Sequence, residues 1–429
     1  MMRRLVIERL GHRGEGVARG EEGLVFVPFA LPGETVLVEA EGERARLVDI
    51  LEPSPDRIEP FCLQYGICGG CAVQTLAEPA YARWKRGLAE TALRNAGLDW
   101  PVEPLVDAHG AGRRRVTFHA RYEKGAARHE KGAARVGFMR ARSHDLVEID
   151  ACPLLEQGLA GAPAAARALA QALAGRSKPL DLAVTLTTGG LDIDIRGAGE
   201  LEEREMLALL ELAENLDLAR LANHGRLVTL RLPPGVMVAS TQVFPPPGAF
   251  LQATAEGEAA IAGLVARGVG EKAKRIADLF CGVGAFALRL AASAQVTAID
   301  ADVAAVEALD RAARTARGLL PISAQARDLF RRPLDIQELN RFDAVVFDPP
   351  RVGAMAQAEA LAASTVRRVV AVSCDPQSFA RDAAILSKGG YASKFITPID
   401  QFRHSPHLEV VALFERAAEA APRRRLLSR

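Results

Sequence analysis

The sequence predicts an α/β protein of three parts: a small N-terminal β-barrel, a central α+β region and a C-terminal doubly wound, largely parallel sheet. Short β-type runs separated by turns fill the first fifty residues. A cysteine-containing stretch of mixed elements follows, and a strand–helix alternation then begins near Lys274 and runs to Phe414. A length of 429 residues suits two or three domains. We place the boundaries at 1–52, 53–235 and 236–429.

The barrel prediction rests on short apolar runs that glycine-rich and Pro-Gly turns separate at even spacing. Evenly spaced short strands with such turns are typical of small closed barrels. The candidate strands span residues 5–7, 24–27, 35–39 and 46–50.

Four of the six cysteines have the spacing of a metal site. Five residues separate Cys62 from Cys68, two separate Cys68 from Cys71, and Cys152 follows about eighty residues later. Four thiolates suit either a zinc ion or a [4Fe-4S] cluster, and the spacing alone does not choose between them. A set of free structural thiols is the alternative, which the Cys-Gly-Gly-Cys turn disfavours.

The rest of the central part mixes β-type runs with helices. A helix is predicted over residues 78–95, ending before Gly97, and a second over 164–173, which Pro163 would open. The hexapeptide Glu-Lys-Gly-Ala-Ala-Arg occurs twice, at 123–128 and 130–135, and is predicted to lengthen the tip of a surface hairpin. The β-type runs span residues 116–122, 134–139, 184–186 and 191–195.

Positive charge is concentrated in this central part although the net charge of the chain is only +1. Between Ala111 and Arg142, ten Lys or Arg residues stand against two Glu residues, with Phe118, Tyr122 and Phe138 interleaved. That combination suits phosphate contacts and base stacking, so we expect a single-stranded or locally opened RNA target. A solvated charged face is the alternative.

The C-terminal part contains continuous runs of Val, Ile, Leu and Ala, which indicate strands buried on both faces of a parallel sheet. Ligands bind such sheets at the carboxyl ends of the strands. The candidate strands span residues 275–280, 296–300, 343–348, 368–373, 393–396 and 408–414.

The first strand–helix junction of this sheet carries a cofactor-type loop. Gly282 and Gly284 would let the backbone approach a ligand closely. Phe286 breaks the dinucleotide pattern, whereas Asp300, at the end of the next strand, can accept hydrogen bonds from ribose hydroxyls. The loop therefore predicts a mononucleoside cofactor such as S-adenosylmethionine, although a lone Gly-x-Gly also occurs in tight turns.

Cys374 is the candidate nucleophile. It follows a predicted buried strand, and Asp375 and Pro376 force a turn there, at the same sheet edge as the cofactor loop. Asp348 begins an Asp-Pro-Pro sequence related to that of base amino-methyltransferases, but Arg351 takes the place of their aromatic residue. Thiolate addition to C6 of uracil would make C5 reactive toward a methylsulfonium. A buried structural cysteine is the alternative.

Glu409 is the candidate base, because the proton on C5 must leave after methyl transfer. It is the only charged residue in the apolar run 408–414, where burial could raise its pKa. An edge-strand acid that faces solvent is the alternative. His404 and His407 are interpreted as structural, since neither has metal-ligand spacing to a cysteine.

Together these motifs resemble those of the bacterial RNA uracil-5-methyltransferases, and most closely the iron-sulfur-containing enzymes that act on 23S ribosomal RNA. The resemblance covers nearly the whole chain, and the first fifty residues look like a TRAM domain, an OB-like RNA-binding barrel. The matching segments are 25–28, 31–34, 61–71, 278–286, 348–351, 373–376 and 407–409.

The resemblance implies a Rossmann-like class I methyltransferase domain with Cys374 as nucleophile and Glu409 as base. It also favours iron-sulfur over zinc, with a [4Fe-4S] cluster held by Cys62, Cys68, Cys71 and Cys152. The S-adenosylmethionine contacts that it implies, together with those predicted above, are Gln252, Phe280, Gly282, Gly284, Asp300, Asp328 and Asp348.

The remaining expectations concern partners and location. Transfer RNA is the main alternative substrate, and a metal-stabilised RNA-binding protein with a degenerate methyltransferase fold is the alternative from another class. The N-terminus meets Glu8 after three apolar residues, too soon for a signal peptide, and no apolar run reaches membrane-spanning length. We expect a cytoplasmic monomer that binds no membrane.

Overall fold

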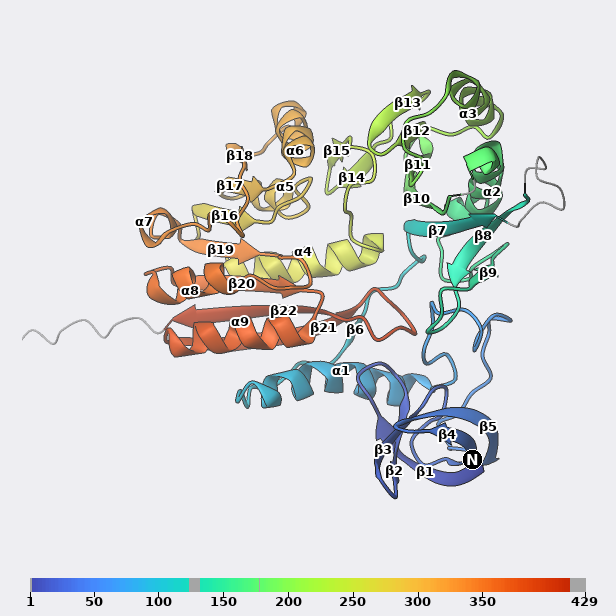
Figure 1. The fold of residues 1–429 in the computed structure, drawn as a ribbon. Helices are drawn as coiled ribbons and strands as arrows, with labels where there is room; N and C mark the ends of the chain where they lie inside the picture. Colours follow the sequence, from blue (N-terminus) through green and yellow to red (C-terminus); the bar gives the residue numbers. More distant parts are fainter. Residues whose placement is uncertain (1, 123–131, 177, 417–429) are drawn as a thin grey trace, which may run out of the picture. The chain divides into compact units, whose positions relative to one another are not determined.

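The computed structural model describes residues 2–122, 132–176 and 178–416, and the chain divides into two compact units (Figure 1). The first unit comprises Met1–Leu88, Pro104–Ala260 and Ile399–Leu408. The second comprises Ala89–Glu103, Ile261–Pro398 and Glu409–Arg429. Within the described residues, no helix is both long and apolar enough to cross a membrane.

The chain begins with the predicted barrel, shown in blue in Figure 1, which closes in the strand order β1-β2-β3-β5-β4. Ile7, Val27, Val36 and Val38 fill its interior and are at most 1% exposed. The second strand was not predicted, because two glycines and an arginine give it the composition of a turn. The strands are β1 (Met2–Leu10), β2 (Gly16–Gly20), β3 (Gly23–Val27), β4 (Thr35–Glu41) and β5 (Arg44–Glu52).

The helix predicted over residues 78–95 is confirmed as α1 (Glu78–Asn95). Gly97 follows it with φ +77°, a left-handed conformation that glycine adopts without strain at a helix end. Glu78 in the first turn and Arg94 in the last complement the helix dipole.

The first unit also holds a seven-stranded sheet in the order β13-β12-β11-β10-β7-β8-β9. Its core includes Phe118, Leu182 and, from helix α2, Leu169, all 0% exposed. The duplicated hexapeptide lies largely outside the described residues, but the strands on either side of it pair antiparallel, with Tyr122 opposite Ala134. The strands are β7 (Arg115–Tyr122), β8 (Ala134–Met139), β9 (Leu146–Glu148), β10 (Leu180–Thr187), β11 (Gly190–Arg196), β12 (Arg220–Asn223) and β13 (Arg226–Leu230).

Smaller elements complete the first unit. The helix predicted from Pro163 is confirmed, with the proline in its first turn. These elements are β6 (Val106–Asp107), the 3-10 helices η1 (Gln157–Leu159) and η2 (Ala174–Arg176), α2 (Ala162–Ala172), α3 (Glu203–Asn215), β14 (Val236–Val238) and β15 (Thr241–Val243), followed by α4 (Ala255–Val269), which continues into the second unit.

The second unit confirms the α/β prediction. Its sheet has the order β18-β17-β16-β19-β20-β22-β21; the strands from β18 to β20 are parallel, and β22 is antiparallel to β20. The strands are β16 (Arg275–Leu279), β17 (Gln295–Asp300), β18 (Ile322–Ala326), β19 (Ala344–Phe347), β20 (Arg368–Ser373), β21 (Tyr391–Asp400) and β22 (Glu409–Arg416). The helices between them are α5 (Ala287–Leu290), α6 (Val303–Thr315), α7 (Ile336–Leu339), α8 (Met355–Ala363) and α9 (Pro376–Lys388).

The packing of α2 gives the first prediction. Leu169→Ala should lower the free energy of unfolding by about 2–5 kcal/mol, because it leaves a cavity in a closed core. The shift of the denaturant midpoint followed by circular dichroism measures this loss. Leu207→Ala on α3 is the matched control, since Leu207 is 60% exposed and the change should stay within about 0.5 kcal/mol. Equal shifts in the two variants would contradict the burial of α2.

Candidate functional site

Strand register brings several predicted residues to one edge of the second-unit sheet. Leu279 in β16 pairs with Ile299 in β17 and with Phe347 in β19. The residues that follow these three positions, Phe280, Asp300 and Asp348, therefore leave the sheet side by side at its carboxyl edge. This is the edge at which ligands bind in open parallel sheets.

Gly282 and Gly284, in the loop after β16, have different structural roles. Both have positive φ values, +52° for Gly282 and +93° for Gly284. A Cβ at Gly284 would lie 2.3 Å from Leu309 Cδ1, so this glycine is required for packing against α6. A Cβ at Gly282 would meet nothing within 4 Å, so the backbone there faces open space. Only Gly282 therefore leaves room that a ligand can use.

Asp300 and Asp328 both shape backbone turns at this edge. Asp300 accepts hydrogen bonds from the amide of Gly282 at 2.8 Å and from the amide of Asp302 at 2.9 Å. Asp328 accepts one from the amide of Phe330 at 2.9 Å. Each carboxylate oxygen has more than one lone pair, so these turns leave capacity for ligand hydroxyls.

An aromatic pair beside the loop was not fully predicted. Phe280 has φ +64°, an uncommon conformation for a non-glycine residue, and its ring centroid lies 5.4 Å from that of Phe330. Phe330 is 50% exposed. Sequence reasoning missed Phe330 because nothing in its local pattern distinguishes it from an ordinary surface residue.

A buried and a half-buried carboxyl group lie at the same edge. Asp278 is 0% exposed, and burial together with the nearby Asp348 raises its pKa well above the usual range. Both carboxyl oxygens of Asp278 lack a hydrogen-bond partner within the described residues. The backbone amide of Ala287 lowers the pKa of Asp278, but by less than burial raises it. Burial also raises the pKa of Asp348 to about 7. An incoming cationic group would relieve this accumulation of buried acid.

Cys374 and Glu409 are brought together by the pairing of β20 with β22. Ser373 lies opposite Val410 in this antiparallel register, so the next residue of one strand faces the preceding residue of the other. Asp375 caps α9 by accepting hydrogen bonds from the amides of Gln377 and Ser378. The cap turns the chain immediately after Cys374, as predicted from the Asp-Pro pair.

The Cys374 thiol is partly shielded from water and lies near acidic groups. Burial, then Glu409, then Asp348 raise the pKa of Cys374 to about 12, while Arg351 lowers it. Glu409 is only 2% exposed, so the solvent-facing alternative for this residue does not hold. The thiol is therefore protonated at neutral pH in the protein without substrate, and proton loss must accompany any attack by sulfur.

Gln252 belongs to the first unit, so its relation to the second-unit loop stays a prediction. Its side chain is 3% exposed and its Oε1 accepts a hydrogen bond from Gln401 Nε2 at 2.6 Å. Gln401 Oε1 in turn accepts from the amide of Ala253 at 2.8 Å, which fixes the orientation of the Gln401 amide. Gln252 is thus held in one orientation by a partner far along the chain.

The four predicted metal-ligating cysteines converge on one cavity of the first unit. Cys62, Cys68, Cys71 and Cys152 all line a cavity of about 830 Å³. Burial and, to a smaller extent, the nearby Cys152 raise the pKa of the Cys71 thiol to about 11. Within the described residues, no three Cys, His, Asp or Glu side chains are arranged as a finished metal-ion site. The four cysteines therefore share one cavity, whereas their binding of a metal centre stays a prediction.

Arginines of the basic segment line the same cavity. Arg113, Arg115, Arg140 and Arg142 contribute to its wall. Among the charges of the segment, Arg142 is paired with Glu15 at 2.5 Å and Arg114 with Glu258 at 2.6 Å. Burial, reinforced by the neighbouring arginines, lowers the pKa of Arg115 to about 10. The segment is thus more than a solvated charged face, since part of its charge is turned inward.

Comparisons with known proteins show the family of this chain. The family model described as tRNA (Uracil-5-)-methyltransferase matches residues 244–417. An uncharacterized RNA methyltransferase of Brucella suis is 45% identical over 97% of this chain and 98% of that protein. The 23S rRNA (uracil(1939)-C(5))-methyltransferase RlmD of Chromohalobacter salexigens is 36% identical over 96% of this chain and 89% of that protein.

A solved structure shares the fold. The crystal structure of Pyrococcus abyssi tRNA (uracil-54, C5)-methyltransferase in complex with S-adenosyl-L-homocysteine matches with a TM-score of 0.71. The match covers 96% of this chain and 100% of that chain at 21% identity. At this identity the likeness shows the fold alone.

The acidic surroundings of Cys374 give the second prediction. Glu409→Gln removes a negative charge that raises the Cys374 pKa, so the pKa should fall and more thiolate should form at a given pH. Since the thiolate is the form that iodoacetamide alkylates, we expect faster alkylation of Cys374 at about pH 8, roughly tenfold for each unit of pKa. Mass spectrometry of the Cys374 peptide over time measures the rate.

The matched control is Glu359→Gln, which removes an exposed carboxylate from α8 in the same unit. Its alkylation rate should equal that of the wild type. In the wild type the rate should continue to rise up to about pH 10, because the thiol pKa lies higher still. Alkylation that is equal or slower in Glu409→Gln would contradict the placement of the two groups.

Proposed function

The chain belongs to the RNA uracil-5-methyltransferase family, and we propose that it methylates C5 of a specific uridine in RNA with S-adenosylmethionine as the methyl donor. The observation that carries this proposal is the placement of Cys374 opposite Glu409 at the carboxyl edge of β20. A thiol and a carboxylate in contact with the same ring can serve as nucleophile and base.

The proposed reaction uses these two residues in sequence. Cys374 gives its proton to water and its sulfur forms a bond to C6 of the target uracil, which breaks the C5–C6 double bond and leaves C5 electron-rich. C5 then takes the methyl group, and the electron pair of the broken methyl–sulfur bond stays with the donor. Glu409 removes the remaining C5 proton, the C5–C6 double bond re-forms, and the bond between C6 and sulfur breaks. The target uridine must leave its stack to reach the thiol.

The residues around the cofactor loop fit S-adenosylmethionine. That cofactor, when bound, supplies an electrophilic methyl group on a positively charged sulfur. Asp278 and Asp348 are acids, buried and half-buried respectively, whose raised pKa values would fall beside positive charge. Gly282 leaves open space for close backbone approach, and Phe280 offers a ring surface. We propose these residues, with Gly284, Asp300, Asp328 and Gln252, as the binding set.

Ribosomal RNA is the proposed substrate. The relative named for 23S rRNA aligns with nearly the whole chain at 36% identity, whereas the solved structure named for tRNA shares the fold at only 21% identity. The N-terminal barrel and the inward-facing arginines of the basic segment supply surfaces for RNA phosphates. Transfer RNA remains the substrate to be compared directly.

We also propose that the four converging cysteines hold a [4Fe-4S] cluster. The residue types fit, because four thiols line one cavity. Burial raises the pKa of the Cys71 and Cys152 thiols, and the nearby Arg113 opposes this rise. A nearby cation stabilises the thiolate form that metal binding requires. The proposed role is structural, since methylation of uracil moves no net electrons.

The covalent step gives the third prediction. RNA in which 5-fluorouridine replaces uridine should form a stable covalent complex with the protein in the presence of S-adenosylmethionine, because fluorine on C5 cannot leave as a cation. A denaturing gel reveals the complex as a shifted band. Cys374→Ala should abolish it completely. Failure of the wild type to form it with any cellular RNA would refute the proposed reaction and favour an RNA-binding protein with a degenerate fold.

The cluster gives the fourth prediction. Protein purified without oxygen should contain about four iron atoms per chain. Cys152→Ser should lower that content sharply, because it removes one ligand. Cys281→Ser is the matched control, since Cys281 is buried in the second unit and is not part of the cavity. Elemental analysis decides the matter, and zinc without iron would reject the cluster.

A further inference from the structure

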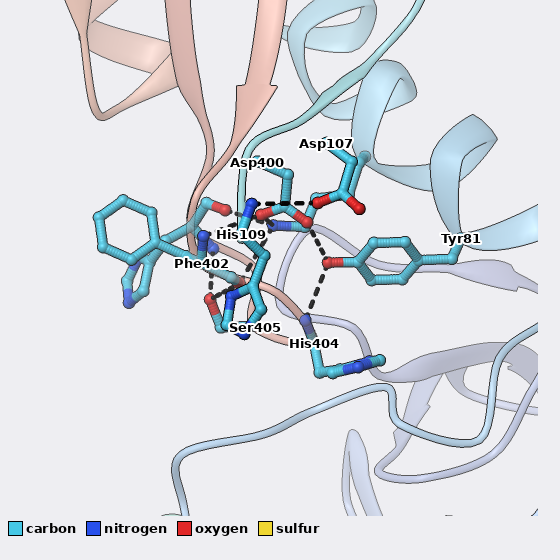
Figure 2. A network of polar contacts seen from close by, with 9 residues as sticks. Tyr81, Asp107, His109, Asp400, Phe402, His404 and Ser405 are labelled. Atoms are coloured by element: carbon cyan, nitrogen blue, oxygen red, sulfur yellow. Dashed lines mark hydrogen bonds and ion pairs between the residues drawn. The ribbon is translucent and has the colours of Figure 1, made fainter. Parts of the chain in front are cut away.

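A buried lysine in α1 holds the end of strand β21, where Asp400 also accepts a hydrogen bond from Tyr81 (Figure 2). Lys85 is 0% exposed and its Nζ lies 2.8 Å from Oδ1 of Asp400, which is 1% exposed. The same oxygen accepts a hydrogen bond from the amide of Phe402 at 3.0 Å. Asp400 Oδ2 accepts one from the hydroxyl of Tyr81 at 2.5 Å. Asp400 is therefore satisfied by three donors from two parts of the first unit.

Lys85 also reaches the far end of the segment that follows Asp400. Its Nζ donates to the backbone carbonyl of His407 and, more weakly at 3.5 Å, to that of Phe402. The Lys85 ammonium group thus links Asp400, at the start of the segment 400–408, to His407, near its end. Glu409 is the second residue after His407 in the chain.

The middle of the same segment is held by independent contacts. The His404 amide donates to the Tyr81 hydroxyl at 2.9 Å, and the His404 carbonyl accepts from the amides of Ala72 and Val73 at 2.7 and 3.2 Å. Burial and the acidic Asp400 raise the pKa of Tyr81, so its hydroxyl keeps the proton that it donates. His404 has φ +63°, a strained conformation that such contacts must maintain.

A buried ion pair of this kind contributes little net stability, because desolvation of both charges offsets their attraction. What the Lys85 contacts do provide is a single geometry for a segment without regular structure. The segment 400–408 is fixed at its start, middle and end, and the chain passes from it directly into β22 at Glu409.

We propose that Lys85 is a positioning residue for Glu409, acting through the Asp400 carboxylate and the His407 carbonyl. The inference rests on the proposed function, in which Glu409 removes the C5 proton. Cys374 lies at the end of β20, whereas the Lys85 contacts described above go to the segment 400–408. Loss of the Lys85 contacts should therefore slow proton removal far more than it slows the attack on C6 and methyl transfer.

The test uses the full-length protein with the double substitution Lys85→Met and Asp400→Asn. This pair removes the ammonium without leaving an unpaired buried carboxylate. The asparagine oxygen can still accept from the Phe402 amide, and the asparagine NH2 group can donate to the Tyr81 hydroxyl. Rapid quenching with substrate RNA and S-adenosylmethionine gives two rates: formation of the covalent methylated adduct and release of methylated RNA. We expect release to fall at least tenfold, adduct formation to stay within threefold, and methylated adduct to accumulate.

The matched control is Arg220→Met with Asp192→Asn. This pair is also buried in the first unit, with Arg220 Nη2 2.6 Å from Asp192 Oδ2, but it joins β12 to β11. It should alter stability without changing the ratio of the two rates. Tyr81→Phe is a milder second variant, which removes one hydroxyl and should accumulate adduct to a smaller extent even where the double variant folds poorly.

The outcomes separate this inference from the proposed function. Accumulation of methylated adduct in Glu409→Gln supports the role of Glu409 as the base. If that variant accumulates no adduct, both the proposed role of Glu409 and the inference about Lys85 are overturned. Where Glu409→Gln does accumulate adduct, a parallel fall of both rates in the Lys85 and Tyr81 variants shows a merely structural role and overturns the inference. Rates equal to those of the wild type overturn it as well.

Discussion

The site depends on one strand register. Because β20 and β22 run antiparallel with Ser373 opposite Val410, the thiol that follows β20 and the carboxylate that begins β22 face each other. A shift of one residue would turn Glu409 to the other face of the sheet. The pairing is secured by continuous burial, since Val370, Val372, Val410 and Ala412 are all 0% exposed. The register of these two strands is thus set by the hydrophobic core.

Burial of acidic groups at the sheet edge is unfavourable in a site without ligand and favours the binding of a positively charged ligand. Asp278 and Glu409 are almost fully withdrawn from water and Asp348 is half-buried. Burial of the thiol, reinforced by Glu409 and Asp348, raises the pKa of Cys374 and keeps it protonated. Such an arrangement is unfavourable by itself. Positive charge on a bound cofactor would relieve it, and this coupling between charge and burial is typical of functional sites.

The sequence predicted those features that depend on local pattern. Apolar runs located the C-terminal strands other than β18, which is not a continuous apolar run, and Asp375 with Pro376 located the turn after Cys374. It did not predict β2, whose glycines resemble a turn, or Phe330, whose role depends on a neighbouring loop. Lys85 gave no signal either, because a lysine in an amphipathic helix normally faces solvent, and its partner Asp400 lies 315 positions away. Contacts of that separation become visible only in the folded chain.

The central claim is that one thiol and one carboxylate replace the C5 hydrogen of an RNA uridine by a methyl group. RNA labelled with tritium at C5 of its uridines tests this most directly, with 23S ribosomal RNA and transfer RNA as separate substrates. The account predicts release of tritium to water in equal amount to the 5-methyluridine formed, with ribosomal RNA preferred, and loss of both products in Cys374→Ala. Methylation of RNA without tritium release would contradict it.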